Sequence, residues 1–245
     1  MKLGFFDSGL GGLLMMESCK KVFPKYNYVF TGDIKNIPYG PRTSEEIFMY
    51  MEPYVLYLLN TVHCDYVCIA CNTASVKGLP LFIKKYPQYV HRIIDIVEPT
   101  IHFLSNNYQE NNILLVLATQ GTVSSGVYTS IKNKIITQIP MPGLVNLIEL
   151  NKKHEAIEMV KDAISYHNTS LVLLGCTHYI WLVRVLEKEF PHITFIGQNI
   201  ILEKIFNNLE QIYENTEEGS SSYYVSGDHE GYTQRYSFPF KKLEL

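Results

Sequence analysis

The chain has 245 residues, enough for one large domain or two small ones, each able to bury its own core. A hydrophobic fraction of 47%, a charged fraction of 18% and a formal charge of -3 exclude a disordered chain and a broad basic surface, so we expect no nucleic-acid partner. The opening MKLGFF is too short for a signal peptide, and no apolar run approaches the ~20 residues that span a bilayer. We therefore expect a cytoplasmic protein that does not enter a membrane.

Short apolar runs alternate with longer amphipathic ones along the chain, a pattern typical of strands and helices around a mostly parallel sheet. The predicted strands are 2–6, 28–32, 66–70, 92–96, 113–118, 135–139, 171–175, 194–196 and 223–225. The predicted helices are 12–22, a helix that follows Thr43, 98–107, 154–167, 180–190 and 200–213. Thr43 and Glu46 have the spacing of a capping box, which fixes where the second helix begins.

Two stretches of the sequence share one pattern. VCIACNTAS (67–75) and LVLLGCTHY (171–179) each run from apolar residues through a small residue to cysteine and, shortly after, threonine. The first eight strands fall into two sets of four, and this pattern occurs once in each set. The sequence thus predicts an α/β fold of two similar domains, with mostly parallel sheets flanked by helices and an active site in the cleft between them.

Polar residues follow several of the predicted strands. In parallel α/β sheets, ligands bind outside the carboxyl ends of the strands, where loops present helix starts and free side chains. The residues at these positions are Asp7, Ser8, Pro38, Tyr39, Gly40, Cys71, Asn72, Thr73, Cys176, Thr177 and His178. Small hydroxyls and amides at helix starts suit a carboxylate ligand, although helix caps use the same residue types.

A glycine-rich turn follows the first strand. Gly9, Gly11 and Gly12 allow a sharp turn and a close approach of the backbone to a ligand, so the sequence favours an anion cradle there. The spacing matches neither common nucleotide motif. A strand-to-helix turn without a ligand is the alternative interpretation.

Position distinguishes two of the five cysteines from the rest. We interpret Cys19, Cys64 and Cys68 as small core residues, because they lie within apolar runs. Cys71 and Cys176 stand where an apolar run meets a polar helix start, and the helix dipole there is expected to lower a thiol pKa.

A metal or redox site is an alternative use of the first cysteine cluster. His63, Cys64, Cys68 and Cys71 lie close in sequence, and the last two form a CxxC pair. Alternation along a strand would place these side chains on both faces of the sheet, so we expect no metal site.

Two thiols in matching positions favour proton transfer over acyl transfer. A cysteine hydrolase needs one nucleophile and one base, which leaves a second thiol without a role. Inversion of a carbon centre instead needs one group to remove a proton and another to return one on the opposite face. His178 and Asp7 are candidates to tune the two thiols, although a capping or surface histidine would fit the sequence around His178 equally well.

Eight short motifs occur along nearly the whole chain. They are FDSGLGG (6–12), GDIKNIPYGPR (32–42), ACNTAS (70–75), VEPT (97–100), ATQGTVSSGVY (118–128), LVNLIE (144–149), LGCTHY (174–179) and VSGD (225–228). In this order they resemble the motifs of the glutamate racemases, within the cofactor-independent aspartate/glutamate racemase superfamily. GQNI (197–200) departs from the family, because it lacks the usual acidic residue and serine.

The resemblance implies a role for each matching residue. Cys71 and Cys176 would be the acid/base pair, with Cys71 acting on the D isomer and Cys176 on the L isomer, and with Asp7, His178 and Glu149 assisting them. The residues implied to bind substrate are Asp7, Ser8, Pro38, Tyr39, Gly40, Asn72, Thr73, Thr119, Thr122, Thr177 and His178.

The resemblance also implies how the whole protein is organised. Residues 1–95 with 208–245 would form the domain that carries Cys71, and residues 96–207 the domain that carries Cys176. No cofactor or metal, a possible homodimer and supply of D-glutamate for peptidoglycan are implied as well. Racemisation of aspartate or other amino acids, a non-catalytic amino-acid sensor and a cysteine hydrolase acting on a small amide are the alternatives.

Overall fold

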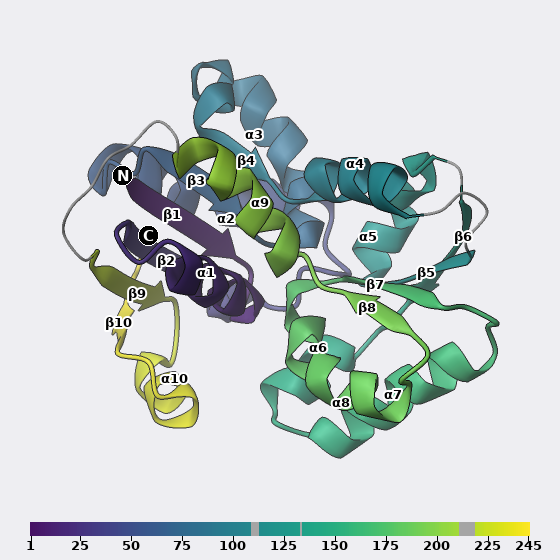
Figure 1. Ribbon diagram of the computed structural model, residues 1–245. Coiled ribbons are helices and arrows are strands. Elements are labelled where there is room, and N and C mark those ends of the chain that lie inside the picture. The colour runs from purple at the N-terminus through teal and green to yellow at the C-terminus, as the bar shows by residue number, and fades with distance from the viewer. Residues whose placement is uncertain (109–112, 133, 211–218) are drawn as a thin grey trace.

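Two parallel sheets organise the chain in this computed structural model, which describes residues 1–108, 113–132, 134–210 and 219–245 (Figure 1). The first sheet has the order β10-β9-β2-β1-β3-β4 and the second β6-β5-β7-β8. The strands are β1 (Lys2–Asp7), β2 (Asn27–Gly32), β3 (Tyr66–Ile69), β4 (Ile93–Asp95), β5 (Ile113–Ala118), β6 (Ile135–Pro140), β7 (Leu171–Gly175), β8 (Thr194–Ile196), β9 (Ser221–Val225) and β10 (Phe240–Lys242). The predicted α/β fold of two halves is confirmed.

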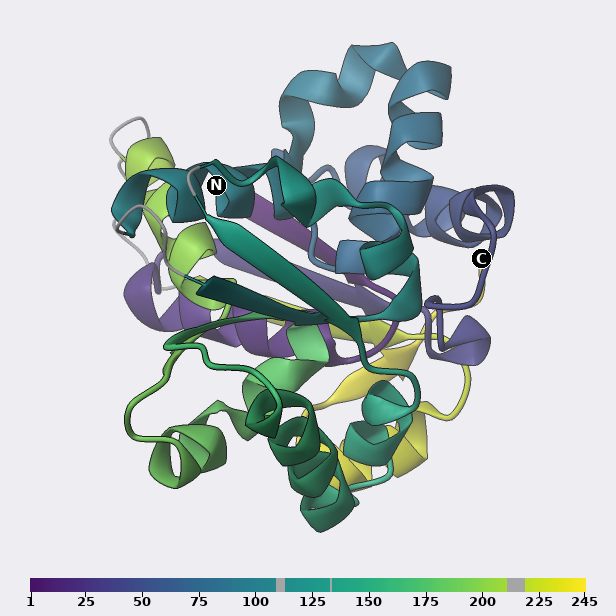
Figure 2. The same ribbon diagram turned by 90° about the vertical axis from the view of Figure 1, so that its right-hand side faces the viewer.

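Helices cover both sheets (Figures 1 and 2). The α-helices are α1 (Gly11–Val22), α2 (Ser44–Leu56), α3 (Leu79–Lys85), α4 (Val97–Asn107), α5 (Gln120–Ser124), α6 (Leu144–Glu149), α7 (Lys153–Ser165), α8 (Val183–Glu189), α9 (Asn199–Glu210) and α10 (His229–Tyr236). Shorter helical turns are η1 (Ile34–Asn36), η2 (Tyr57–Thr61), η3 (Ala74–Gly78), η4 (Pro87–Arg92), η5 (Val127–Ser130) and η6 (Thr177–Leu182). None of the helices described is long and apolar enough to cross a membrane.

Local sequence explains where several of these elements begin. The Thr43 hydroxyl accepts from the Glu46 N–H at 3.2 Å, and the Glu46 carboxylate accepts from the Thr43 N–H at 2.8 Å. The predicted capping box is therefore present at the start of α2. Strands β5 and β7 lie side by side within their sheet and are buried almost throughout, which explains their unbroken apolar sequences.

Two elements differ from the sequence prediction. The predicted helix 180–190 is the short turn η6 followed by α8. The predicted strand 223–225 begins earlier, as β9 at Ser221, because β2 pairs with β9 from Ser221 onward. The part of the predicted helix 200–213 that follows Glu210 lies outside the described residues.

The chain's last segment joins the first half. Strand β9 pairs with β2 in parallel, so that Phe30 lies opposite Tyr223. A shared core connects the halves, since it contains Phe5 from β1, Leu173 from β7 and Phe206 from α9. The carboxyl ends of β1, β3 and β7 are thereby held close to one another by packed apolar side chains.

Candidate active site

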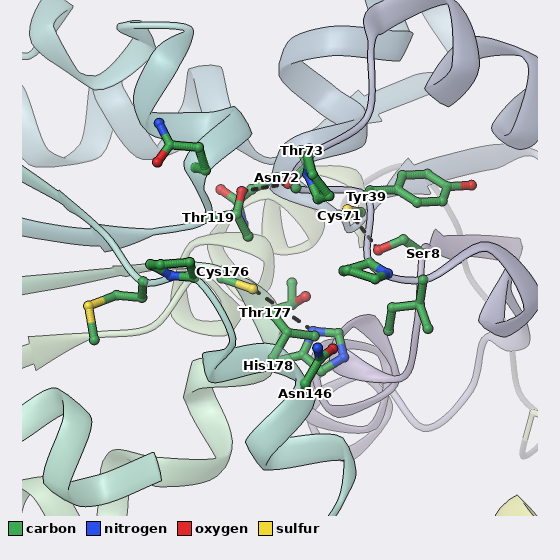
Figure 3. Close-up of a pocket in the computed structure, with 18 of the residues that line it drawn as sticks. Ser8, Tyr39, Cys71, Asn72, Thr73, Thr119, Asn146, Cys176, Thr177 and His178 are labelled. Carbon is green, nitrogen blue, oxygen red and sulfur yellow. Dashed lines mark hydrogen bonds between the residues drawn. The ribbon is translucent and has the colours of Figure 1, made fainter. Parts of the chain in front are cut away.

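A cavity of about 310 Å³ lies between the two halves, at the carboxyl ends of the central strands. Cys71, after β3, and Cys176, after β7, both line it, and Figure 3 shows them among the surrounding side chains. The residues lining the cavity are Ser8, Ile37, Pro38, Tyr39, Gly40, Pro41, Cys71, Asn72, Thr73, Thr119, Gln120, Met141, Pro142, Gly143, Val145, Asn146, Cys176, Thr177 and His178. No Lys, Arg, Asp or Glu is among the residues that the structure places around it. Hydroxyls, amides, backbone N–H groups and His178 are therefore the polar groups available to a ligand.

Cys71 is held by neighbours from its own half. Its sulfur lies 3.3 Å from the Ser8 hydroxyl and accepts from the Ala74 N–H at 3.4 Å. Burial raises the pKa of the Cys71 thiol to about 12, the negative charge of Asp7 raises it as well, and the two hydrogen bonds only partly offset them. The expectation that a helix start lowers this pKa was wrong, because the loss of hydration outweighs the local dipole.

This raised pKa predicts how Cys71 responds to an alkylating reagent. The thiolate is the reactive form, so alkylation of Cys71 by iodoacetamide should rise about tenfold per pH unit from pH 7 to pH 9 without a plateau. Peptide mass mapping at each pH would measure it. A plateau below pH 9 would show that the thiol ionises far more easily than its burial implies.

Cys176 has a different neighbour on the other side of the cavity. Its sulfur lies 3.9 Å from Nδ1 of His178, and Nε2 of that ring lies 2.7 Å from the Glu149 carboxylate. Burial alone would lower the pKa of His178, but its hydrogen bonds to Cys176 and Glu149 and the charge of Glu149 raise it well above the usual 6.5. The imidazole is therefore protonated near neutral pH and able to donate to the Cys176 sulfur.

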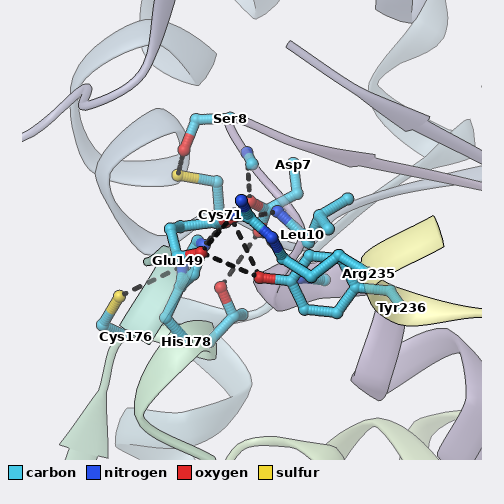
Figure 4. Close-up of polar contacts among 12 residues, drawn as sticks. Asp7, Ser8, Leu10, Cys71, Glu149, Cys176, His178, Arg235 and Tyr236 are labelled. Atoms are coloured by element: carbon cyan, nitrogen blue, oxygen red, sulfur yellow. Dashed lines mark hydrogen bonds and ion pairs between the residues drawn. The ribbon is translucent and has the colours of Figure 1, made fainter. Parts of the chain in front are cut away.

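Glu149 is fixed by groups from three parts of the chain (Figure 4). Its side chain accepts from the Leu10 N–H at 3.3 Å and from the Tyr236 hydroxyl at 3.3 Å, and Arg235 donates to its backbone carbonyl at 2.7 Å. Burial would raise the pKa of Glu149, but the hydrogen bond and charge of His178, with the hydrogen bonds from Leu10 and Tyr236, lower it overall. The C-terminal helix α10 thus supports the Cys176 side of the site, a contact for which the sequence carried no local signal.

The glycine-rich turn holds the protein's own carboxylate. Asp7 accepts from the N–H groups of Gly9 at 2.7 Å and Gly12 at 3.1 Å, and from the Thr177 hydroxyl at 3.0 Å. A Cβ at Gly11 would lie 2.2 Å from the Thr177 hydroxyl oxygen, so this glycine lets the second half approach closely. The side chain of Asp7 therefore occupies the expected anion cradle. Burial raises the pKa of Asp7, although these hydrogen bonds and the charge of His178 act in the opposite direction.

Most residues predicted to bind substrate lie around the cavity. Those that line it are Ser8, Pro38, Tyr39, Gly40, Asn72, Thr73, Thr119, Thr177 and His178. Thr119 connects the halves, because its hydroxyl lies 2.8 Å from that of Thr73 and 3.1 Å from that of Thr122. Asp7, Thr122 and Glu149 do not line the cavity, and each reaches it through a hydrogen-bonded neighbour.

The cysteines of the first cluster do not share one face of the sheet. Cys68 packs in the shared core, whereas Cys64 and Cys71 belong to the apolar cluster on the opposite face of the first sheet. Alternation along β3 therefore separates Cys68 from Cys71, as the sequence indicated. Among the residues described, no three His, Cys, Asp or Glu side chains are grouped closely enough to hold a metal ion.

Comparison with known proteins decides the family. A glutamate racemase of Clostridium botulinum (strain Alaska E43 / Type E3) is 34% identical over 203 residues, which cover 77% of this chain and 77% of that protein. The chain belongs to the glutamate racemase family. A glutamate racemase of Persephonella marina is 33% identical over 208 residues, covering 81% of this chain and 78% of that protein. No protein-family model matches the chain.

Solved structures of glutamate racemases have the same fold. That from Thermus thermophilus, in complex with β-chloro-D-alanine, has a TM-score of 0.84 at 21% identity and covers 100% of this chain and 97% of its own. That from Francisella tularensis, in complex with D-glutamate, has a TM-score of 0.83 at 23% identity, with coverages of 100% and 96%. As a member of the glutamate racemase family, the chain is a cofactor-independent amino-acid racemase, an isomerase.

Proposed function

We propose that the chain interconverts L- and D-glutamate by proton transfer at the α-carbon, with Cys176 acting on the L isomer and Cys71 on the D isomer. One observation carries this proposal: the two thiols come from opposite halves of the molecule and line a single cavity. In the L-to-D direction, the Cys176 thiolate removes the α-proton as the Cys71 thiol delivers one to the opposite face. This step leaves Cys176 protonated and Cys71 as the thiolate. The reverse reaction begins from that form.

The surroundings of each thiol support these opposite roles. The raised pKa of Cys71 keeps it protonated before an L substrate binds, as an acid for the return step must be. The protonated His178 lies beside Cys176 and can donate to its sulfur when that sulfur carries charge. Asp7 lies on the Cys71 side and Glu149 on the Cys176 side, so each thiol has its own carboxylate nearby.

The cavity's chemistry suits a small zwitterion with two carboxylates. Hydroxyls of Ser8, Thr73 and Thr119 offer hydrogen-bond donors, and His178 offers positive charge. We include in the proposal supply of D-glutamate for peptidoglycan, no nucleic-acid partner, a homodimer, and domains of 1–95 with 208–245 and 96–207. Sedimentation velocity tests the homodimer, because a monomer at micromolar concentration would contradict it.

The direct test is incubation of the purified protein with L-glutamate, without pyridoxal phosphate and with a chelator present. We expect the circular dichroism of the solution to decay to zero as the isomers equilibrate. Parallel reactions with L-aspartate measure substrate preference, and faster decay with aspartate would identify it as the substrate. Tight binding of glutamate without turnover would instead support a sensor, and release of ammonia from a small amide would support a hydrolase.

A further inference from the structure

A buried amide pair joins the halves next to Cys71. Gln198 follows β8 in the second half and is 0% exposed, while Asn72 follows β3 in the first half and is 2% exposed. The Asn72 Nδ2 donates to the Gln198 Oε1 at 2.6 Å, and the Gln198 Nε2 donates to the Asn72 Oδ1 at 2.9 Å. Neither amide can turn over without breaking both bonds, so each fixes the orientation of the other.

One backbone carbonyl sets the direction of this network. The Thr100 hydroxyl donates its single hydrogen to the carbonyl of Ile96 at 2.6 Å. It must therefore accept from Gln198, and the Gln198 atom 3.2 Å away must be the amide nitrogen. The Gln198 oxygen then faces Asn72, so the Asn72 nitrogen must donate to it.

Tyr128 completes the same arrangement on the other side of Asn72. Its hydroxyl donates to the Asn72 Oδ1 at 2.6 Å and lies 3.0 Å from the Gln198 Nε2. The Asn72 oxygen thus accepts two hydrogen bonds, which use both of its lone pairs. Its nitrogen gives one hydrogen to Gln198 and retains a second, so Asn72 has only a donor left to offer a ligand.

We propose that Gln198 is a positioning residue for substrate binding, because it turns the Asn72 amide so that the remaining N–H serves a carboxylate of the bound amino acid. The inference rests on the proposed function. Asn72 lines the cavity and follows Cys71 directly, so the carboxylate in question is the one on the α-carbon that Cys71 approaches. An Asn72 turned the other way would present an oxygen to this anion and repel it.

The test compares kinetics of Gln198→Glu with those of the wild-type protein. The introduced carboxylate has nearly the size of the amide but cannot donate a hydrogen bond, and one of its oxygens would face the Asn72 oxygen. We expect KM to rise about tenfold for both isomers, with kcat changed less than about threefold. Gln198→Met removes both hydrogen bonds without adding charge and should raise KM similarly, which secures the test should the glutamate variant not fold.

Thr169→Val provides the matched control. Thr169 is buried away from the cavity, and its hydroxyl donates to the backbone carbonyl of Ile113 at 2.7 Å. Loss of this hydroxyl should lower the thermal midpoint without changing KM. Wild-type KM values in both Gln198 variants would overturn the inference alone, as would an equal rise of KM in Thr169→Val. Absence of turnover in the wild-type arm would overturn the proposed function and this inference with it.

Discussion

Replacing Cys71 by alanine is expected to lower glutamate racemisation by about 10²–10⁴-fold, the range that a positioned acid or base contributes. Cys71 and Cys176 enter the cavity from different halves, so neither sulfur can serve the face assigned to the other. In Cys71→Ala, Cys176 still faces the L isomer beside His178. In deuterated water this variant should slowly label L-glutamate at the α-carbon without inverting it.

Cys176→Ala should show the opposite selectivity and label the D isomer alone. Nuclear magnetic resonance of the α-position, combined with chiral chromatography, measures label and configuration together. Cys68→Ala is the control, because Cys68 is buried in the shared core and should affect stability but not racemisation. Racemisation at the wild-type rate by either active-site variant would contradict the assignment.

The second large effect is expected from Glu149→Gln, which removes the charge that faces His178. The pair is nearly buried, with 4% of the His178 side chain and 10% of the Glu149 side chain exposed, and the two atoms lie 2.7 Å apart. Loss of one partner from a buried pair leaves the other charge uncompensated, so we expect the free energy of unfolding to fall by about 3 kcal/mol near pH 6. Urea unfolding of both proteins measures this difference.

The effect of this substitution should depend on pH in a defined direction. The raised pKa of His178 stabilises the fold fully below its unfolded value of 6.5, and this contribution is lost as the pH rises through the folded value. The lowered pKa of Glu149 stabilises the fold above its unfolded value of 4.5, and this is lost as the pH falls through the folded value. The difference from wild type should therefore be largest between pH 4.5 and pH 6.5 and decrease at alkaline pH.

An exposed carboxylate gives the comparison for that experiment. Glu155 pairs with Lys152 at 3.7 Å, and more than half of each side chain is exposed, 54% and 52%. Exposed ion pairs contribute little to the free energy of unfolding, so Glu155→Gln should unfold at the same urea concentration as the wild-type protein. A pH-independent loss of stability in Glu149→Gln would show that packing, and not charge, accounts for its role.

The sequence predicted the strand ends well because their signal is local. An apolar run that stops at a polar residue marks the carboxyl end of a buried strand, and parallel pairing then places Asp7, Cys71 and Cys176 at neighbouring edges. Matching patterns in two halves therefore identified both thiols before any contact was known. Asp7 and His178 were candidates from their positions after strands, whereas Glu149 was implied only by the family resemblance.

Other features of the site depend on contacts between distant residues. Gln198 meets Asn72 across 126 positions of sequence, and Arg235 meets Glu149 across 86, so no local pattern marks either residue. The pKa of Cys71 was predicted in the wrong direction because burial is a property of the folded molecule. The glycine-rich turn looked like a ligand site because its sequence does not show that Asp7 occupies its N–H groups.

The central claim is that two separate groups act on opposite faces of one carbon, and the origin of the product's α-hydrogen tests it most directly. L-Glutamate is converted in deuterated water, and both isomers are analysed before a tenth has reacted. We predict that the D-glutamate formed carries deuterium at the α-carbon while the remaining L-glutamate stays unlabelled. Product that retains the substrate's own hydrogen, or equal labelling of both isomers, would contradict the account.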